Sequence, residues 1–275
     1  MAVQRIAAFS DGDAGGNPAG VVICDGLPET AAMQAIAAEV GYSETAFAAP
    51  QDQGWRVRYF APETEVPFCG HATIALGAAL AWRHGDGVFA LSLNNADITV
   101  EARRHGATVV AALQSPPTRS EPAASGLVSG ALSLFGYESE DLDGRLPPAI
   151  ADAGARHLVL ALRSRERLAA MTYDQAAGRA LMHAAGLVTI ILTHAETPQR
   201  FHARNPFASG GIYEDPATGA AAAAFAGYLR DLGWPHGGVI DIVQGEDMGM
   251  ASRLRAEIPP TPGATIRVSG TARLM

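Results

Sequence analysis

Two stretches of the sequence decide which fold to expect: Glu65-Val-Pro-Phe-Cys-Gly-His-Ala72 and Glu214-Asp-Pro-Ala-Thr-Gly-Ala-Ala221. Both contain the pattern E-x-P-x-x-G. An apolar stretch continues each of them, A-T-I-A-L-G-A-A-L-A-W in the first and A-A-A-A-A-F-A-G-Y-L in the second. The two stretches stay aligned at a constant offset as far as Leu80 and Leu229. An internal repeat of this kind predicts two halves built to one design.

The two apolar stretches are expected to form interior helices. A helix without a polar face is normally enclosed by other elements, and its first backbone N–H groups have no partner within the helix. A buried helix start therefore favours an anion as acceptor, and Gly70 and Gly219 allow close approach to the backbone. We expect the two starts to bind a carboxylate-bearing metabolite. The alternative is that Glu65, Asp215 or Thr218 caps its own helix.

Outside the repeat, the pattern alternates between strands and single helices. Ala, Met and Ile at helical spacing predict a helix over Thr30–Val40 that ends near Gly41. Another helix is expected around Tyr173–Ala185. The alternation in W-R-V-R-Y-F predicts that Trp55–Phe60 pairs as a strand with Glu44–Ala49. The two repeated helices are expected over Phe68–Trp82 and Thr218–Leu232.

A segment rich in Pro, Ser and Ala, Gln114–Ser129, separates the two halves, and we place the domain linker there. The expected domains are an N-terminal one over residues 1–118 and a C-terminal one over residues 119–275. The alternative is that the C-terminal strand returns to the first domain. A chain of 275 residues is long enough for two domains with substantial cores.

The composition excludes several classes of protein. Hydrophobic residues make up 48% and charged residues 17%, which is typical of a globular chain. The formal net charge of −8 argues against a nucleic-acid partner, because phosphate binding requires a basic face. Only Cys24 and Cys69 are present, which fits a reducing compartment. Neither a signal peptide nor a membrane-spanning run is recognised, so we expect a cytoplasmic protein that does not bind membranes.

A series of short motifs occurs in order along the chain. They are Gly16-Asn-Pro-Ala-Gly-Val-Val22, Met33-Gln-x-Ile-Ala-x-Glu39, Ser43-Glu-Thr-Ala-Phe47, Arg58-x-Phe-x-Pro62, Glu65-x-Pro-x-x-Gly-His-Ala-Thr73, Glu214-Asp-Pro-Ala-Thr-Gly219 and Gln244-Gly-x-x-Met-Gly249. In this order and spacing they are similar to the motifs of the PhzF-like phenazine-biosynthesis family, relatives of diaminopimelate epimerase. The similarity covers essentially the full length. It implies an α+β fold with two pseudo-symmetric domains, each an antiparallel β-sheet curled around a central α-helix, and an active site between the domains.

The same resemblance implies a cofactor-independent isomerase in which a glutamate acts as acid and base on a small, carboxylate-bearing substrate. No metal and no cofactor are implied, and a homodimer is expected by analogy. No Walker loop, G-x-S-x-G elbow, H-E-x-x-H or paired C-x-x-C motif points elsewhere. One alternative is a racemase, epimerase or lyase that acts on an amino or hydroxy acid. Another is a non-catalytic small-molecule-binding protein on the same fold.

Glu44 is the catalytic candidate. On a strand it would share one face with Ala46 and Ala48, whose small side chains leave room for a ligand, while Ser43 would point to the opposite face. A partly buried carboxylate is suited to general-base catalysis. The glutamate of the S-E-T motif is also the proton-transfer residue that the resemblance implies. The alternative is an exposed glutamate at the start of a strand.

In the N-terminal half, the substrate-binding candidates are Gly70 and His71 of the first repeated motif, together with Asn17. The resemblance implies that His71 lines the substrate site, where it would donate a hydrogen bond or hold a positive charge. The alternative is a satisfied histidine in the core. Asn17, in the G-N-P-A-G turn, either bonds the substrate or shapes the turn.

In the second repeated motif, the candidates are Asp215, Thr218 and Gly219. Asp215 resembles the acidic residue of the family that faces the substrate, and its alternative role is an N-terminal cap. Thr218 would supply a hydroxyl and Gly219 a backbone donor. His157 and Met250 are expected at the edge of the site.

Cys69 and Thr218 occupy equivalent places in the repeat. In the related epimerases a cysteine at each central helix acts as acid or base, but Thr218 cannot abstract a proton at neutral pH. A two-cysteine racemase is therefore not expected, and Cys69 is interpreted as a small, buried apolar residue. Two departures from the family motifs, Ala220 in place of serine and Met250 in place of arginine, bear on the identity of the substrate more than on the fold.

Overall fold

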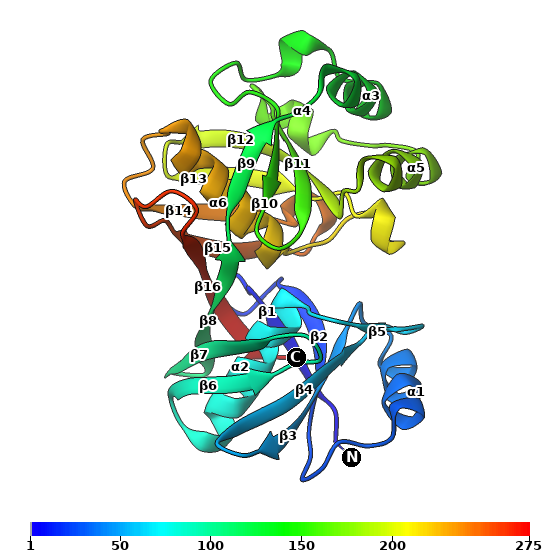
Figure 1. The fold of residues 1–275 in the computed structure, drawn as a ribbon, viewed down its shortest axis with the longest axis vertical. Helices are drawn as coiled ribbons and strands as arrows, with labels where there is room; N and C mark the ends of the chain where they lie inside the picture. Colours follow the sequence, from blue (N-terminus) through cyan, green and yellow to red (C-terminus); the bar gives the residue numbers. More distant parts are fainter. Residues whose placement is uncertain (1) are drawn as a thin grey trace. The chain divides into compact units, whose positions relative to one another are not determined.

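The structure is a computed structural model that describes residues 2–275. It divides into two compact units. Unit 1 comprises the chain up to Gln114 together with Ser269–Met275, and unit 2 comprises Ser115–Val268. The chain leaves unit 1 within strand β8 (Thr108–Pro117) and returns to it within strand β16 (Thr265–Leu274) (Figure 1). The end of the last strand therefore belongs to unit 1.

Unit 1 is built around helix α2. Before β8, its elements are β1 (Gln4–Ala8), β2 (Asn17–Ile23), α1 (Thr30–Val40), β3 (Thr45–Gln51), β4 (Gly54–Phe60), β5 (Glu65–Val66), α2 (Gly70–His84), β6 (Gly87–Ser92) and β7 (Asp97–His105). Every residue of α2 from His71 to Ala81 is buried. The helix packs against β1, β2, β3, β6 and β7. The prediction of a central, enclosed helix is thus confirmed.

Unit 2 is built around helix α6 in the same way. Before β16, its elements are β9 (Arg119–Pro122), α3 (Ser125–Phe135), η1 (Ser139–Asp141), β10 (Ala149–Asp152), β11 (Arg156–Ala161), α4 (Arg165–Ala169), α5 (Gln175–Ala185), β12 (Thr189–Thr197), β13 (Arg200–Arg204), η2 (Ala208–Gly210), α6 (Gly219–Leu232), β14 (Val239–Gln244), η3 (Glu246–Met248) and β15 (Ser252–Glu257). Residues Ala221 to Arg230 of α6 are buried. The helix packs against β9, β10, β11, β12 and β15.

The predicted α+β fold class is confirmed, but in both units the strands form parallel as well as antiparallel pairs. In unit 1, β2 pairs parallel with β3, and β4 with β6. In unit 2, β11 pairs parallel with β12, and β13 with β14. Along the chain, at least one helix connects the two strands of each parallel pair. Helix α1 connects β2 to β3, and α2 connects β4 to β6. Helices α4 and α5 connect β11 to β12, and α6 connects β13 to β14. Parallel neighbours require such a crossover, whereas the strand patterns alone do not specify direction.

The repeat seen in the sequence is also a repeat of pairings and of side-chain contacts. The series β1, β2, β3, β4, β6, β7 pairs in the same directions as the series β10, β11, β12, β13, β14, β15. Arg58 of β4 donates to Glu65 at 2.8 Å, and Arg204 of β13 donates to Glu214 at 3.0 Å. The glutamate of each E-x-P-x-x-G motif thus ties the segment before the central helix to the preceding strand.

The segment expected to be a linker, Gln114–Ser129, is largely regular structure. It contains the end of β8, the whole of β9 and the first residues of α3. Strand β9 pairs with β10 and is the last strand in the sequence of hydrogen-bonded neighbours that form the sheet. Proline is tolerated in such edge strands, so the composition that suggested a linker reflects an edge strand.

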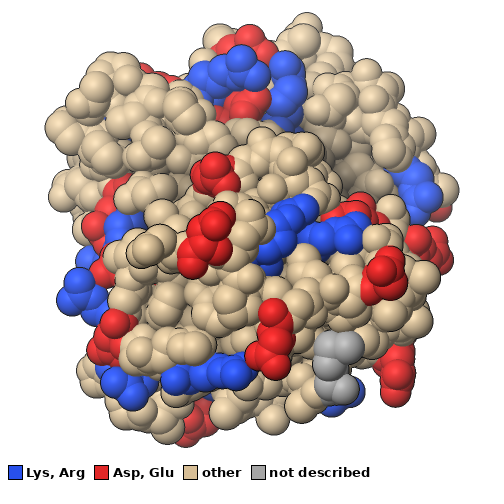
Figure 2. Space-filling view, turned by 60° about the horizontal axis from the view of Figure 1, so that its bottom comes forward, with Lys and Arg blue, Asp and Glu red and all other residues tan. Residues whose placement is uncertain are grey.

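Charges of both signs are interspersed on the surface. Figure 2 shows basic side chains lying next to acidic ones across the face drawn. Arg104 with Asp86 and Arg255 with Asp241 are examples of exposed ion pairs. Within residues 2–275, none of the helices has the length and apolarity of a membrane span. The exclusion of a nucleic-acid partner stays a prediction from the net charge.

Candidate active site

Glu44 lies immediately before β3, which corrects the predicted start of that strand. Its backbone carbonyl accepts a hydrogen bond from the N–H of Gly20 in β2 at 3.1 Å. Its side chain is 15% exposed. Because Glu44 lies outside the strand, the alternation that placed Ser43 and Glu44 on opposite faces does not apply. The side chains of both residues approach His71.

His71, in the first turn of α2, connects three polar side chains. Its Nε2 atom lies 3.4 Å from Glu44 Oε2 and 3.3 Å from Ser43 Oγ. Its Nδ1 atom lies 3.3 Å from Cys69 Sγ. The ring itself is buried. A carboxylate at one ring nitrogen and a thiol at the other fix the imidazole beside Glu44, where the pair can share or exchange a proton.

Cys69, the N-cap residue of α2, is buried, but its contact with His71 shows that it is more than an apolar filler. Ligand atoms of Glu44, Cys69 and His71 lie within 4.8 Å of one another, and zinc accepts this set of donors. However, Cys69 Sγ lies closer to Nδ1 (3.3 Å) than to Nε2 (3.9 Å), whereas Glu44 approaches Nε2. A shared ion would require the ring to turn. We therefore interpret the cluster as a proton-transfer site.

The two central helices begin in similar ways. Gly70 and Gly219 are their first residues, and within the described chain neither N-cap residue, Cys69 or Thr218, forms a side-chain cap hydrogen bond. The N-cap side chains thus leave the first backbone N–H groups to other acceptors. An anion at each helix start stays a prediction.

Asn17 is the buried first residue of β2, the strand that bonds to Glu44 through Gly20. The preceding Gly16 has φ +86°, and a Cβ atom there would lie 2.8 Å from the carbonyl oxygen of Ala8. The turn therefore requires glycine. The sequence motif is accounted for by this turn, and a contact between Asn17 and a substrate stays a prediction.

In unit 2, Thr218 is the centre of a compact polar cluster. Its hydroxyl is hydrogen-bonded to Asp215 Oδ2. It also accepts from Asn205 Nδ2 at 2.6 Å and from Gln244 Nε2 at 3.1 Å. The Thr218 N–H donates to Gln244 Oε1 at 3.3 Å. The Thr218 hydroxyl therefore has three partners within the protein, and a contact between it and a substrate stays a prediction.

Two members of this cluster, Gln244 and Asn205, were not predicted as site residues. Gln244 opens the Q-G motif, and its Nε2 also donates to the backbone carbonyl of Asp215 at 2.7 Å. The following Gly245 has φ +76°, and a Cβ atom there would lie 2.9 Å from the carbonyl oxygen of Pro216. The Q-G motif thus supports the D-P-A-T loop. For Asn205 the sequence contains no comparable signal.

His157, expected at the edge of the site, is completely buried in β11. Its Nδ1 atom lies 2.7 Å from Thr189 Oγ1. Burial lowers the pKa of His157 to about 4, although the negative charge of Asp152 acts in the opposite direction. His157 is therefore a neutral imidazole at neutral pH.

This shifted pKa makes the stability of the protein depend on pH. Between about pH 6.5 and pH 4 the unfolded chain binds a proton at His157 and the folded chain does not. The free energy of unfolding should therefore fall as the pH falls through this window, by about 3 kcal/mol from this group. Urea unfolding at several pH values measures the slope. His157→Asn, which keeps a donor toward Thr189 without titrating, should flatten it; an unchanged slope contradicts the assignment.

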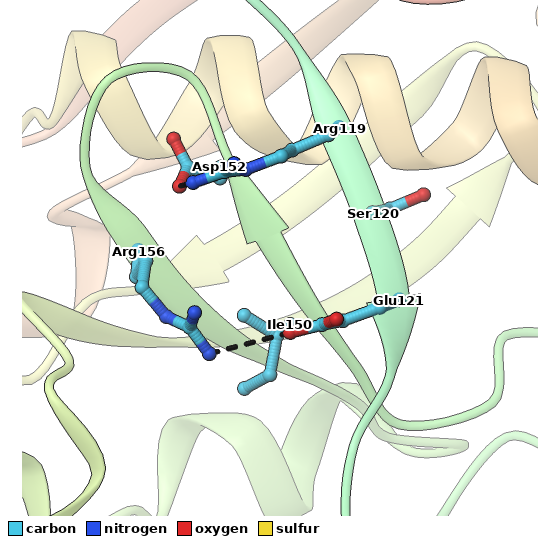
Figure 3. A pocket seen from close by; sticks show the side chains of 6 residues that line it. All are labelled: Arg119, Ser120, Glu121, Ile150, Asp152 and Arg156. Carbon is cyan, nitrogen blue, oxygen red and sulfur yellow. Dashed lines mark hydrogen bonds and ion pairs between the residues drawn. The ribbon is translucent and has the colours of Figure 1, made fainter.

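A surface hollow of about 150 Å³ lies on the outer strands of unit 2 and is shown in Figure 3. Its lining residues are Arg119, Ser120, Glu121, Ile150, Asp152 and Arg156. Both guanidinium groups are already paired, Arg119 with Asp152 at 2.8 Å and Arg156 with Glu121 at 3.3 Å. Because both lining carboxylates, Glu121 and Asp152, are already paired with guanidinium groups, neither is free to act as a general base, and we do not place the active site there.

Comparison with known proteins agrees with the motifs and the fold. The family model for phenazine biosynthesis-like proteins, PhzC-PhzF, matches residues 6–275. An uncharacterised isomerase of Mesorhizobium japonicum is 34% identical over 94% of this chain and 91% of its own length. Trans-2,3-dihydro-3-hydroxyanthranilate isomerase of Pseudomonas aeruginosa is 33% identical over 96% of this chain and 94% of its own length. A PhzF-family protein of Bacillus anthracis, 22% identical, superposes with a TM-score of 0.87 over 99% of this chain and 96% of that one, which shows the shared fold.

Proposed function

This chain belongs to the phenazine biosynthesis-like (PhzC-PhzF) family, and from that premise we propose that it is a cofactor-independent isomerase. It moves a proton on a small, carboxylate-bearing metabolite, with Glu44 as acid and base. The observation that carries this proposal is the contact between Glu44 Oε2 and His71 Nε2, at 3.4 Å and largely shielded from solvent. A carboxylate held in this way is a candidate for proton transfer at carbon.

In the proposed reaction, Glu44 removes a proton from a carbon atom of the substrate and returns it to a different carbon. The electron pair of the broken C–H bond shifts into the adjacent unsaturated system, so a double bond changes position and the composition is unchanged. His71 stabilises the negative charge that develops meanwhile, because it lies beside Glu44 and its ring is fixed from both sides. Ser43, at 3.3 Å from the same ring nitrogen, supports this orientation.

The sequence also favours a mechanism without a Schiff base. The sequence contains arginine but no lysine. Schiff-base catalysis with a carbonyl substrate or with pyridoxal phosphate uses a lysine amine. A proton transfer by Glu44 needs no such group.

Substrate binding is proposed to involve residues of both repeated motifs. Asp215 accepts a hydrogen bond from a donor group of the substrate. The backbone N–H groups at Gly70 and Gly219 donate to its anionic groups, because neither helix start is capped by its N-cap side chain. Asn17 is a further proposed contact. A homodimer is proposed on the family resemblance alone.

The experiment that tests the function is incubation in D₂O with trans-2,3-dihydro-3-hydroxyanthranilate, the substrate in the name of one relative, and with a panel of carboxylate metabolites. Proton NMR and mass spectrometry follow the products. An isomerase incorporates deuterium at a new carbon and keeps the composition. Inversion at one carbon indicates a racemase or epimerase, and loss of a group indicates a lyase. Binding of a metabolite with neither product formation nor exchange contradicts an enzymatic role.

Ala220 stands where the family usually has serine, next to the start of α6. If the missing hydroxyl restricts the substrate, Ala220→Ser should raise kcat/KM for trans-2,3-dihydro-3-hydroxyanthranilate about tenfold, the worth of one ordinary hydrogen bond. Steady-state kinetics of the two proteins on this compound make the comparison. Ala226→Ser, a change elsewhere on the same helix, is the control and should bring no such gain. Equal kcat/KM values for the Ala220→Ser variant and the unaltered protein would contradict this role of position 220.

A further inference from the structure

We propose that a buried chain of hydrogen bonds holds the Asp215 carboxylate in place, with Asn205 as its positioning residue. The chain runs from His157 through Thr189, Asn205 and Thr218 to Asp215. A role of Asp215 in substrate binding rests on the proposed function above. The chain and its direction do not, because they follow from the contacts alone.

The direction of the chain is set first at Thr189. Its hydroxyl donates to Asn205 Oδ1 at 3.0 Å. A hydroxyl carries one proton, so the Thr189 oxygen can only accept from His157, whose Nδ1 lies 2.7 Å away. Nδ1 must then carry the proton of the neutral ring, and Nε2 is left as a bare acceptor.

The environment of His157 agrees with this assignment. Its Nε2 atom is buried and has no hydrogen-bond partner among residues 2–275. Orphaned N–H groups are rarer in protein interiors than under-satisfied acceptors, so an unprotonated Nε2 is the less costly state. The negative charge of Asp152 raises the pKa of His157, but the effect of burial is larger and keeps the ring neutral.

The same direction continues through Asn205 to Asp215. Since the amide oxygen of Asn205 accepts from Thr189, its Nδ2 donates to Thr218 Oγ1 at 2.6 Å. Gln244 Nε2 donates to the same hydroxyl oxygen at 3.1 Å. Two donors occupy both lone pairs of the Thr218 oxygen, so its proton is directed at Asp215 Oδ2. The direction of the chain therefore makes Asp215 Oδ2 a hydrogen-bond acceptor.

Asn205 links the two hydroxyls because its amide oxygen accepts from Thr189 and its amide nitrogen donates to Thr218. A carboxylate at this position would accept from both threonines and compete with Asp215 for the Thr218 proton. An apolar side chain would leave Thr189 and Thr218 each without one partner. Both losses act on Asp215 through Thr218, so Asn205 positions the group and does not itself react.

The direction is tested by ¹⁵N NMR of the histidine rings at neutral pH, without any substrate. We expect the His157 proton on Nδ1, with the signal assigned from its loss in His157→Asn. Thr189→Ser should keep the Nδ1–H form, and Thr189→Val should lose the preference for it. A proton on Nε2 in the unaltered protein, or identical spectra for the Val and Ser variants, would overturn the proposal.

The positioning role is tested by crystal structures of Asn205→Leu and of the unaltered protein. We expect the Thr218 hydroxyl to turn away and the Asp215 carboxylate to shift in the variant. An unmoved Asp215 would overturn the role of Asn205. Thr189→Ser, which keeps the chain, is the matched control and should leave Asp215 in place. Turnover by Asp215→Asn tests the proposed function separately, because none of these structural readouts depends on activity.

Discussion

Glu44→Gln is expected to lower the rate of proton exchange by about 10²–10⁴-fold, the usual contribution of a positioned general acid or base. Glutamine is nearly isosteric and keeps a polar contact to His71, but it cannot accept the proton from carbon. Deuterium incorporation from D₂O into the substrate found in the exchange screen measures the rate. Substrate affinity and the thermal midpoint of unfolding should change little, because glutamine fills the same space and can still contact His71.

Glu63→Gln is the matched control for this experiment. Glu63 lies in the same unit and is exposed, so the same chemical change there should leave exchange unaffected. If Glu44→Gln retains full exchange, Glu44 is not the acid and base. If the unaltered protein binds the metabolite but neither protein forms product or exchanges protons, the protein is a binding protein on this fold.

Glu214→Ala is expected to destabilise the protein by about 3–5 kcal/mol, the cost of leaving one charge of a buried pair without its partner. The Arg204 side chain is 8% exposed and that of Glu214 is 2% exposed. Arg204 also donates to the backbone carbonyls of Ala169 and Met171, so it cannot easily turn to solvent. The free energy of unfolding in urea measures the loss.

The pseudo-symmetry of the chain supplies the control. Glu65→Ala breaks the equivalent pair with Arg58, whose side chains are 19% and 25% exposed, so water compensates the remaining charge and the loss should be about 1 kcal/mol. The double variant Arg204→Met with Glu214→Leu should recover much of the stability, since no unpaired buried charge remains. Equal losses for Glu65→Ala and Glu214→Ala would contradict this account.

The helices show which elements can be predicted from the local sequence pattern. Helix α1 has the predicted bounds, Thr30–Val40, because its apolar spacing and the left-handed Gly41 are both local signals. The two central helices were recognisable from apolar composition alone. Helix α3 (Ser125–Phe135) was not predicted, because a Pro- and Ser-rich segment precedes and overlaps it.

Some residues of the candidate site could likewise be predicted from the sequence, and others could not. The motifs pointed to Glu44, His71 and Asp215, since each stands next to a signal that is visible along the chain. The contact of Ser43 with His71 was excluded by assuming a regular strand, which in fact begins one residue after Glu44. Asn205 stands outside every motif, and its role follows from its bonds to two hydroxyls.

By itself, the sequence determined the two-fold repeat, the apolar central helices and the carboxylates on which a mechanism can be built. These features depend on residue type and on spacing over a few turns, which a chain carries with it before it folds. The tertiary structure alone decided the strand directions, the partners of His71 and the polarity of the hydrogen bonds that lead to Asp215. Those depend on which distant side chains packing brings within about 3 Å, the range in which hydrogen bonds act, and no local pattern specifies such neighbours.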